Sequence, residues 1–396
     1  MAPVSWNPLS TVAGLLTAWI ALMAAYLLAL SVAALLGDPP PPPGPARRRF
    51  AVLIPAHDEA TVIRRLLASL RAQQYPTDLF TVFVVADNCT DDTAALAREA
   101  GATVLERHEP ALAAKGHALA WLLGRVRAAG PVDAYVVLDA DSVVEADLLS
   151  RFDARMESGS RVIQAQYRVL NAGASSVTAL RDAALASLHF LRPAGRTRLG
   201  LSCGLKGNGM CFEASLLDRF GWPSAGLAED VEFHLLLVSA GLRVDFAPEV
   251  LVRADMPVTL AGSRTQHLRW ESGRLRSLRL AIPLLARGIV NLDPIAADAA
   301  VEQFVPPLSV AVVVGAGCAL VQFLLGTPQL AFTAAAATAG LATHVVAGLI
   351  AVHAPPRAYL ALLGAPAYIA WKVSLYARSV LTPSKQPWVR TDRSGR

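Results

Sequence analysis

The sequence predicts an α/β domain with a mostly parallel sheet, flanked on both sides by helices that cross a membrane. Between Phe50 and Val252, apolar runs of strand length alternate with helix-like segments, which is typical of a parallel sheet with right-handed crossovers. The chain is 54% hydrophobic and only 17% charged, which is too apolar for an ordinary soluble enzyme. This apolar excess is concentrated at the two ends of the chain, so membrane segments are expected there.

The N-terminal segment, residues 1–37, contains no charged residue. Within it, Thr11–Leu36 is long enough for one span, which needs about 20 apolar residues. No basic residue precedes this stretch and no small-residue cleavage site follows it. We therefore interpret it as a membrane anchor and not as a signal peptide.

A proline-rich basic linker, residues 38–49, follows the anchor. Five consecutive prolines, Pro39–Pro43, make it stiff, and Arg47–Arg49 end it. By the positive-inside rule, these arginines place the central region in the cytoplasm and the N-terminus outside. The net charge of +5 fits a protein that faces anionic membrane lipid. A nucleic-acid partner is not favoured, because the arginines cluster beside membrane segments and lack interleaved exposed aromatic residues.

Residues 50–260 form the predicted α/β domain. The expected strands are Ala51–Pro55, Thr81–Ala86, Thr103–Leu105, Tyr135–Leu138 and Val162–Gln166. The expected helices are Glu59–Gln74, Asp92–Ala100, Gly116–Ala128, Ala146–Ser158 and Val231–Ala240. About 200 residues suffice for one well-buried core. The four cysteines form no C-x-x-C pair, so a reduced cytoplasmic domain is expected and a zinc site is not.

A basic amphipathic region, residues 261–300, is expected to lie on the membrane surface. Within Arg264–Leu280, five arginines alternate with leucines. An ordinary solvated helix face would have a similar pattern, but the adjoining membrane segment favours the interfacial interpretation.

The C-terminal membrane region, residues 301–382, is expected to contain two spans, at 304–325 and 329–352. Gly326-Thr327-Pro328 provides the turn between them. Tyr359–Leu381 is a further apolar segment, interrupted by Pro366, Lys372 and Arg378. We favour an interfacial or re-entrant segment there, with a third span as the alternative. Residues 383–396 form a basic tail.

Two carboxylates, Asp139 and Asp141, directly follow the apolar run that ends at Leu138. In an open α/β sheet, ligands bind outside the carboxyl ends of the strands. Oxygen ligands suit a hard divalent cation, so this pair is a candidate metal site. An Asp pair after a strand is also common as a plain turn or helix cap, and this pattern alone does not separate the two.

Further acidic groups occur at other expected strand ends. Asp58 and Glu59 follow the first strand, Asp87 follows the second, and Glu229-Asp230 opens a later helix. Because the carboxyl ends of parallel strands meet at one crevice, we expect these groups to converge with Asp139 and Asp141.

The segments that carry these groups are "VLIPAHDEA", "VVADNCTDDT", "AKGHAL", "VLDADS", "LAEDVEF" and "QHLRW". Through them the region Phe50–Arg279 resembles the inverting family 2 glycosyltransferases, which have the GT-A fold. The flanking apolar segments resemble the membrane-integrated branch of that family, which includes cellulose, chitin and hyaluronan synthases and ceramide glucosyltransferase.

The resemblance implies a role for each group. The nucleotide-sugar would be held by Pro55, Ala56, Asp58, Glu59, Asp87, Lys115, Asp139 and Asp141. Asp87 is the candidate for reading the base, because a carboxylate accepts a hydrogen bond from a uracil N–H. Asp58 stands where the family usually has Asn, so its partner is left open. Asp139 and Asp141 would hold Mg²⁺ or Mn²⁺ against the diphosphate.

Asp230 is the predicted catalytic base, since inverting transfer needs one carboxylate to deprotonate the acceptor hydroxyl. Glu229 would cap the helix or orient its neighbour. Gln266, Arg269 and Trp270 match the family's Q-x-x-R-W element, in which Arg meets the diphosphate and Trp faces the acceptor sugar. Asn208 is expected beside the acceptor pocket, although its flanking glycines equally suit a tight turn.

In the C-terminal tail, Trp388, Arg390, Thr391 and Arg393 resemble a lid that closes over the nucleotide in membrane-bound relatives. Such a lid must be cytoplasmic, whereas a third C-terminal span would carry the tail outside. The sequence leaves this conflict open.

The predicted function is sugar transfer from a nucleotide-sugar donor, with UDP as the favoured nucleotide, to a lipid or short-glycan acceptor at the cytoplasmic membrane face. The alternatives are a processive polysaccharide synthase and, among non-enzymes, an inactive sugar-nucleotide sensor or scaffold. A transporter is disfavoured because His344 is the one ionisable group within the predicted spans. The sequence does not indicate the oligomeric state.

Overall fold

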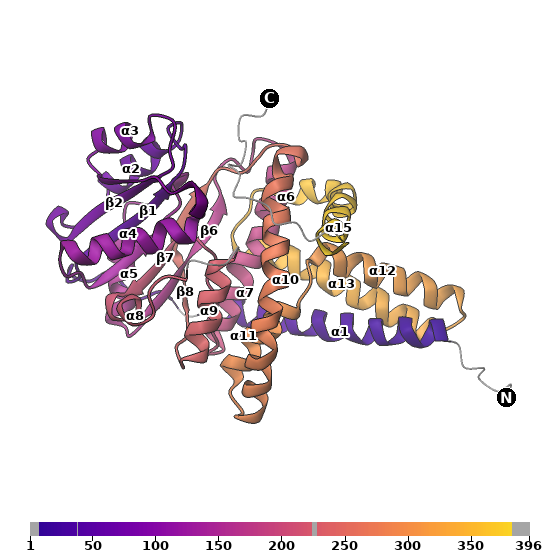
Figure 1. Cartoon of the computed structure of the whole chain (residues 1–396). Coiled ribbons are helices and arrows are strands. Elements are labelled where there is room, and N and C mark those ends of the chain that lie inside the picture. The colour runs from indigo at the N-terminus through magenta and orange to yellow at the C-terminus, as the bar shows by residue number, and fades with distance from the viewer. Residues whose placement is uncertain (1–7, 38, 224–227, 382–396) are drawn as a thin grey trace.

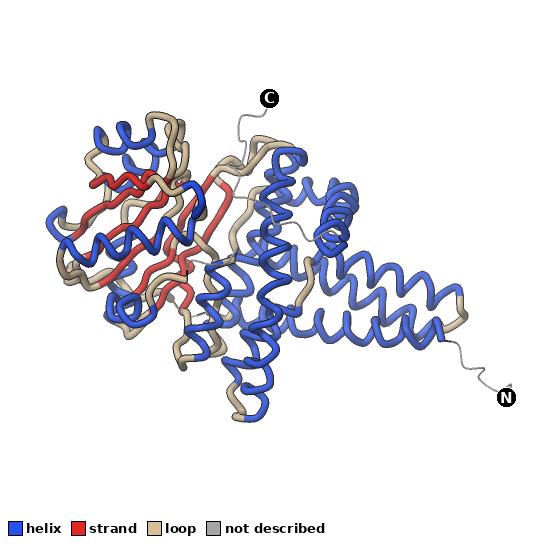
Figure 2. Tube along the Cα trace, viewed as in Figure 1, coloured by secondary structure: helices blue, strands red, loops and turns tan. Residues whose placement is uncertain are grey.

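The computed structural model describes residues 8–37, 39–223 and 228–381, apart from the side chains of residues 265, 269, 271, 272, 274–276 and 379–381. An α/β domain lies at one end and a bundle of apolar helices at the other (Figure 1). All the strands belong to the α/β domain, and the bundle is entirely helical (Figure 2).

The first half of the sheet is parallel. Strands β1 (Phe50–Ala56), β2 (Phe80–Asp87), β3 (Thr103–Arg107) and β4 (Ala134–Val137) lie in the order β3-β2-β1-β4. Each β1 partner is in parallel register, with Phe50 opposite Phe80 and Ala134. The strands predicted from the sequence are confirmed here, with ends that differ by one or two residues.

The second half of the sheet is mixed and continues β4-β7-β6-β8-β5. It contains β5 (Ser142–Val144), β6 (Val162–Val169), β7 (Met210–Glu213) and β8 (Asp245–Ala254). Strand β7 runs antiparallel to both β4 and β6, whereas β6 and β8 are parallel. Of these strands the sequence predicted β6 alone, because β5 and β7 are too short to show a period and Pro248 interrupts β8.

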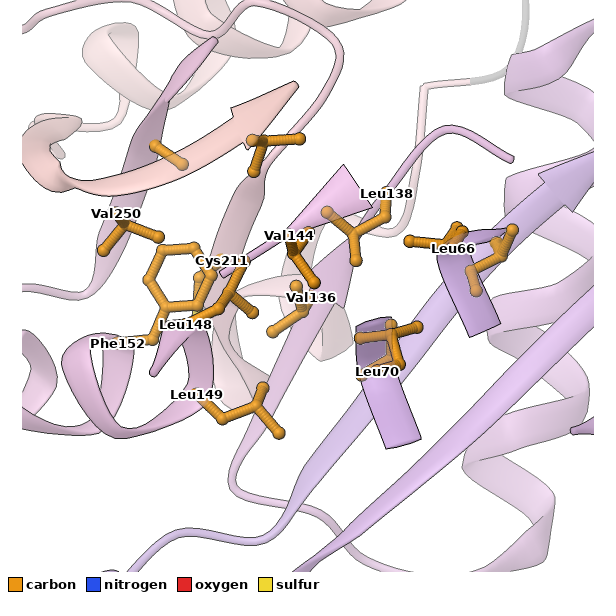
Figure 3. Packing of buried hydrophobic residues seen from close by; sticks show 14 of the residues in the cluster. Leu66, Leu70, Val136, Leu138, Val144, Leu148, Leu149, Phe152, Cys211 and Val250 are labelled. Carbon is orange, nitrogen blue, oxygen red and sulfur yellow. The ribbon is translucent and has the colours of Figure 1, made fainter. Parts of the chain in front are cut away.

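Helices cover both faces of the sheet. On one face lie α2 (Ile63–Arg71), α3 (Thr93–Glu99) and α5 (Leu148–Glu157), which pack on alternate strand residues such as Val52. Figure 3 shows the centre of this packing, where Leu66 and Leu70 of α2 and Phe152 of α5 lie over the sheet.

The opposite face carries α4 (Lys115–Ala129), α8 (Ala214–Phe220) and α9 (Glu229–Ser239). Because strand side chains alternate between faces, Leu53 packs on this side while Val52 and Ile54 pack on the other. Packing on this face places the N-termini of α4 and α9 near the carboxyl edge of the sheet, where the predicted site lies.

The apolar bundle consists of α1 (Pro8–Leu35), α12 (Leu308–Leu324) and α13 (Pro328–Ala351), which run side by side away from the sheet (Figure 1). Among the described residues, three helical segments are long and apolar enough to cross a membrane: α1, α13 and Pro356–Arg378. The pair formed by α11 (Pro294–Phe304) and α12 adds a fourth if it is one broken span, with a bend of 72°.

The predicted span 304–325 is interrupted at its start. Helix α12 begins at Leu308, and Phe304 belongs to α11. Pro306-Pro307 explains the break, because proline lacks an N–H donor and disfavours a helical conformation in the residue before it.

The segment predicted to be interfacial, Tyr359–Leu381, is also helical. It comprises α14 (Pro356–Ala361), a short 3₁₀ turn and α15 (Ala365–Leu381). Its length and composition allow a span, which is the alternative that the sequence left open.

The predicted amphipathic region, residues 261–300, consists of the long helix α10 (Leu260–Val290), which continues through Pro283, and the first residues of α11. Helix α10 lies between the α/β domain and the bundle, and it contacts α9, α11 and α15. The predicted Q-x-x-R-W element, which lies on α10, is therefore on the helix between these two parts of the molecule (Figure 1).

A buried ionic cluster joins the bundle to the α/β domain. Arg196 of α7 (Arg192–Arg198) is fully buried and pairs with Asp298 and Glu302 of α11, each at 2.8 Å. Arg196 also donates to the hydroxyl of Tyr26 on α1 at 2.6 Å. Glu302 in turn lies 3.4 Å from the ammonium of Lys206, which immediately precedes a glycine of the predicted site.

Candidate active site

The carboxyl ends of β1 and β2 form the predicted nucleoside side of the site. Pro55 and Ala56 are the last two residues of β1, and Asp87 is the last residue of β2. Asp87 is buried and pairs with the guanidinium of Arg107 at 2.5 Å. Arg107 ends β3 directly opposite Asp87 in the parallel register. Arg107 was not among the residues predicted from the sequence, although its position at a neighbouring strand end was the available signal.

Asp58 follows β1 in the left-handed region, with φ of +53°. Its carboxylate accepts a hydrogen bond from the backbone N–H of Thr90 at 2.6 Å and another from Asp91 at 3.3 Å. Asp58 therefore ties the loop after β1 to the loop after β2. The neighbouring Glu59 is buried, and its backbone N–H donates a hydrogen bond to the Thr93 hydroxyl at 2.8 Å.

Asp58, Cys89 and Asp91 bring potential metal-ligand atoms within 4.8 Å of one another. Asp91 already accepts hydrogen bonds from the N–H groups of Thr93 and Ala60. Burial raises the pKa of the Cys89 thiol to about 11, so it stays protonated at neutral pH. These groups close the two loops, and we do not assign the metal to them.

The predicted metal pair lies in the turn between β4 and β5. The backbone N–H of Asp139 donates to the side-chain oxygen of Asn208 at 3.1 Å, and Asn208 donates to the hydroxyl of Ser142 at 2.9 Å. Arg65 donates to the carbonyl of Asp141 at 3.3 Å. These bonds fix the turn from behind, while the carboxylates of Asp139 and Asp141 remain half-buried at the sheet edge. Two carboxylates held in this way fit Mg²⁺ or Mn²⁺, which both take hard oxygen ligands.

Asn208 was expected beside the acceptor pocket, but its side chain is almost fully buried. Its amide oxygen accepts the N–H of Asp139 and its amide nitrogen donates to Ser142, so both atoms hold the turn that carries Asp139 and Asp141. The structure thus gives Asn208 a supporting position behind the carboxylate pair.

Lys115 lies at the centre of the charged groups. Its ammonium donates to Asp139 and to the carbonyl of Gly207, each at 2.5 Å. Burial by itself would lower the pKa of Lys115, but Asp139, Glu229 and Asp230 together raise it above its ordinary value. Lys115 therefore carries a positive charge among three acidic side chains, as the first residue of α4.

Glu229 and Asp230 form the first turn of α9. Burial raises the pKa of both carboxyl groups, while the positive charge of Lys115 acts in the opposite direction. Asp230 also accepts the backbone N–H of Val231 at 2.9 Å. A carboxylate with a raised pKa is a stronger proton acceptor, so Asp230 has the chemistry that a general base requires.

The loop before β7 brings the backbone close to these acids. Gly207 has a φ of +79°, which favours glycine. A Cβ at this position would lie 3.2 Å from a carboxylate oxygen of Asp230 and 3.8 Å from the ammonium of Lys115. The absence of a side chain at Gly207 therefore keeps space beside the predicted base.

The predicted Q-x-x-R-W element lies on α10. Gln266 accepts a hydrogen bond from Arg181 at 2.8 Å, and the guanidinium of Arg181 stacks 5.1 Å from the indole centre of Trp270. The Trp270 side chain is 40% exposed. The Arg269 side chain is outside the described part of the structure, as are the proposed lid residues Trp388, Arg390, Thr391 and Arg393.

Residues 45–273 match a protein-family model described as "Glycosyltransferase like family 2". The chain belongs to this family. The match covers more than half of the chain and includes every predicted site residue of the α/β domain, together with the Q-x-x-R-W element.

Curated relatives of this family 2 member differ in how much of their length they share with it. A "Probable glycosyltransferase YdaM" from Bacillus subtilis (strain 168) is 25% identical over 57% of this chain and 55% of its own length. An "N-acetylglucosaminyltransferase" from Rhizobium meliloti (strain 1021) is 27% identical over 85% of this chain and 80% of its own. A "Beta-monoglucosyldiacylglycerol synthase" from Nostoc sp. (strain PCC 7120 / SAG 25.82 / UTEX 2576) is 29% identical over 56% of this chain and 48% of its own. The chain thus spans about half the length of the first and third relatives.

Among solved structures, the mannosyltransferase PcManGT from Pyrobaculum calidifontis, in complex with GDP-Man and Mn²⁺, superposes with a TM-score of 0.53. The likeness covers 92% of this chain and 100% of the mannosyltransferase chain, at 21% identity. The shared fold is the GT-A fold, which confirms the fold class predicted from the sequence.

Proposed function

We propose that this family 2 glycosyltransferase moves a sugar from a nucleoside diphosphate donor, with UDP as the nucleotide, to a lipid or short-glycan acceptor at the cytoplasmic membrane face. The reaction inverts the anomeric carbon. One observation carries the proposal: the ammonium of Lys115 faces Asp139, Glu229 and Asp230 at the carboxyl edge of the sheet. A cationic group for phosphate and a buried carboxylate for the acceptor hydroxyl thereby share one site.

Asp230 takes the proton of the acceptor hydroxyl as that oxygen attacks the anomeric carbon. The glycosidic bond to the diphosphate breaks on the opposite face, so one carboxylate is sufficient and no covalent intermediate forms. Burial keeps the pKa of Asp230 raised, and burial together with the charge of Asp230 raises the pKa of the adjacent Glu229 on the first turn of α9. Lys115 remains protonated and meets the phosphate as a point charge.

Asp87 reads the base in this proposal, because its carboxylate accepts the uracil N–H while Arg107 fixes its orientation. Asp139 and Asp141 would hold the divalent cation, whose chemistry is to offset charge on the leaving diphosphate. Asn208 orients that pair through the backbone of Asp139. The names of the relatives, which include N-acetylglucosaminyltransferases and glucosyldiacylglycerol synthases, support a glycan or lipid acceptor.

The test is to incubate the purified full-length protein with a panel of nucleotide sugars and Mn²⁺ and to measure nucleotide release with and without lipid. We expect one UDP-sugar to be consumed faster when acceptor lipid is present. Asp139→Asn and Asp141→Asn should each abolish this turnover while the protein keeps its fold, because each loses a ligand charge. Full activity of both variants in metal-depleted buffer would refute the metal assignment.

The product separates the two enzymatic candidates. A lipid or short-glycan product supports the proposal, whereas long polymer built from one acceptor would indicate a processive synthase. Binding of nucleotide sugar without any turnover would indicate the sensor or scaffold alternative.

A further inference from the structure

Arg181 is a buried cation whose described hydrogen-bonding and stacking partners are neutral. It lies on α6 (Ser176–Leu185), and only 3% of the residue is exposed. Its guanidinium bonds to the amide oxygen of Gln266 and stacks on Trp270, and neither partner carries a negative charge. Its Nη1 atom is buried and has no hydrogen-bond partner among the described residues. Within the same part of the chain, no carboxylate forms an ion pair with Arg181.

A second cationic side chain lies in the same cluster. Lys372 of α15 is buried, and its ammonium lies 2.5 Å from Nδ1 of His267 on α10. Burial lowers the pKa of His267 well below its ordinary value, as do the charges of Lys372 and Arg181, so the imidazole is neutral. The other ring nitrogen, Nε2, is buried without a hydrogen-bond partner among the described residues.

Aromatic rings surround these polar groups. The ring of His267 lies 5.4 Å from Trp270 and 5.3 Å from Trp371, measured between centroids. Tyr368 lies 5.7 Å from Trp371. Trp270 is partly exposed, and Tyr368 and Trp371 are half-buried, so the cluster opens to the surface on its aromatic side.

The cluster lies beside the apolar helices. Lys372, Tyr368 and Trp371 of α15 fall within Pro356–Arg378, one of the segments able to cross a membrane. Helix α6 packs on α13 and α14 through Ala183 and neighbouring apolar residues. Tryptophan and tyrosine beside basic groups are typical of the level where lipid headgroups meet the hydrocarbon. A ligand that reaches this cluster from the membrane would present its headgroup.

We propose that Arg181, His267 and Lys372 bind the phosphate group of a membrane lipid. A buried cation costs free energy unless it is paired, and Arg181 has no carboxylate partner among the described residues. A phosphate supplies that charge and accepts hydrogen bonds from Nη1 of Arg181 and Nε2 of His267. Arginine binds phosphate through paired N–H groups, lysine through a point charge. The exposed indole of Trp270 covers the headgroup above the phosphate. This site adjoins the predicted acceptor element, because Arg181 contacts Gln266 and Trp270, but lipid binding here does not require the transfer reaction to occur.

The test measures binding of fluorescently labelled phosphatidic acid to the full-length protein in phosphatidylcholine nanodiscs. We expect Arg181→Gln and Lys372→Gln each to weaken binding roughly ten- to a hundredfold, the loss typical of a hydrogen bond to a charged group. Arg64→Gln is the control: Arg64 is an exposed arginine on α2 of the α/β domain, where it pairs with Glu99, and its loss should leave lipid binding unchanged. Because a buried arginine can contribute to folding, each variant must first retain the wild-type elution volume and affinity for UDP.

Inorganic phosphate and UDP serve as competitors in the same assay. The proposal requires that neither displaces the labelled lipid at concentrations that saturate the donor site. Displacement by inorganic phosphate would show a site for free phosphate, and displacement by UDP would show that the cluster holds the donor diphosphate. Either result overturns the lipid site, as would equal binding by wild type and both variants. If the protein bound the lipid but no nucleotide sugar, the proposed transferase function would fail while this site stood.

Discussion

At the scale of single residues, the group predicted to bind the nucleotide base and the predicted catalytic base lie on different elements around Lys115. Asp87 and its partner Arg107 lie at the ends of β2 and β3, whereas Asp230 lies at the start of α9. Lys115 contacts Asp139 and Gly207 between these two regions. Substitutions at Asp87 and Asp230 should therefore affect different steps.

Asp230→Asn keeps the size and hydrogen-bonding shape of the side chain but cannot accept a proton at neutral pH. We expect a rate loss within the range of about 10²–10⁴-fold that general-base catalysis contributes. Donor affinity should be nearly unchanged, because the predicted nucleotide contacts lie elsewhere. The measurement pairs calorimetric donor binding with the transfer rate at saturating donor.

Asp87→Asn is the matched control, and it should weaken nucleotide affinity before it affects the maximal rate. If Asp230→Asn instead lost donor affinity and kept its maximal rate, Asp230 would be a binding residue. The base would then have to be sought at Glu229.

The pH dependence of the rate follows from the raised pKa of Asp230. A general base works in its unprotonated form, so the rate should fall as the pH decreases through that pKa. Since burial raises the pKa, the inflection should lie above the ordinary aspartate value of about 3.9. Lys115 counteracts this rise, so Lys115→Gln should move the inflection to still higher pH. The check is the maximal rate against pH at saturating donor, and an inflection that Lys115→Gln leaves in place would contradict this coupling.

At the scale of elements, the ionic cluster around Arg196 fixes α7 against α1 and α11. Both acids lie on α11, four residues apart, so they are on the same side of that helix. The backbones of α7 and α1 also approach each other closely, since a Cβ on Gly195 would lie 2.2 Å from the carbonyl oxygen of Leu30. The α/β domain and the bundle are therefore held together by both charge and close packing.

Arg196→Met should destabilise the protein by about 3–5 kcal/mol, because it leaves Asp298 and Glu302 buried without their main positive partner. Arg198→Met is the control on the same helix, where the side chain is exposed and a change of about 1 kcal/mol or less is expected. Thermal unfolding in detergent measures both. Equal stability of the two variants would show that the buried pair does not hold the helices together.

At the scale of the whole molecule, the number of crossings decides on which side the tail lies. In the predicted topology the N-terminus is outside, so that α1 would place the α/β domain in the cytoplasm. If the pair α11–α12 and helix α13 both cross the membrane, they would return the chain to the same side. Whether α14–α15 also crosses determines if the predicted lid can reach the site.

A cysteine-accessibility scan on a cysteine-free background tests this topology. We expect cysteines at positions 48 and 270 to react from the cytoplasmic side, and one at position 5 from outside. Reaction of position 5 with a cytoplasmic reagent would reverse the orientation. A cysteine at position 394 tests α14–α15 separately, because cytoplasmic labelling there is required for a lid.

Much of the fold could be predicted because it rests on local pattern. The strands β1, β2 and β4 contain continuous apolar runs, as expected for strands buried on both faces. The edge strand β3 is shorter and partly exposed, and each of the four strands was located within two residues. Strands β5 and β7 contain three and four residues, too few to show a period. Their existence depends on β8 and β4 being present to pair with them.

The site shows the same division. The sequence by itself determined which residue types stand at the strand ends, because an acidic group after an apolar run is a local feature. It also determined the apolar segments and the break at Gly326, since span length and turn chemistry are local too. Only the tertiary structure decided that Arg107 pairs with Asp87, that Asn208 lies behind Asp139 and that Arg181 meets Gln266. Each of these contacts joins elements far apart in the chain, and the free energy of a buried polar contact depends on the packing around it, which no local pattern records.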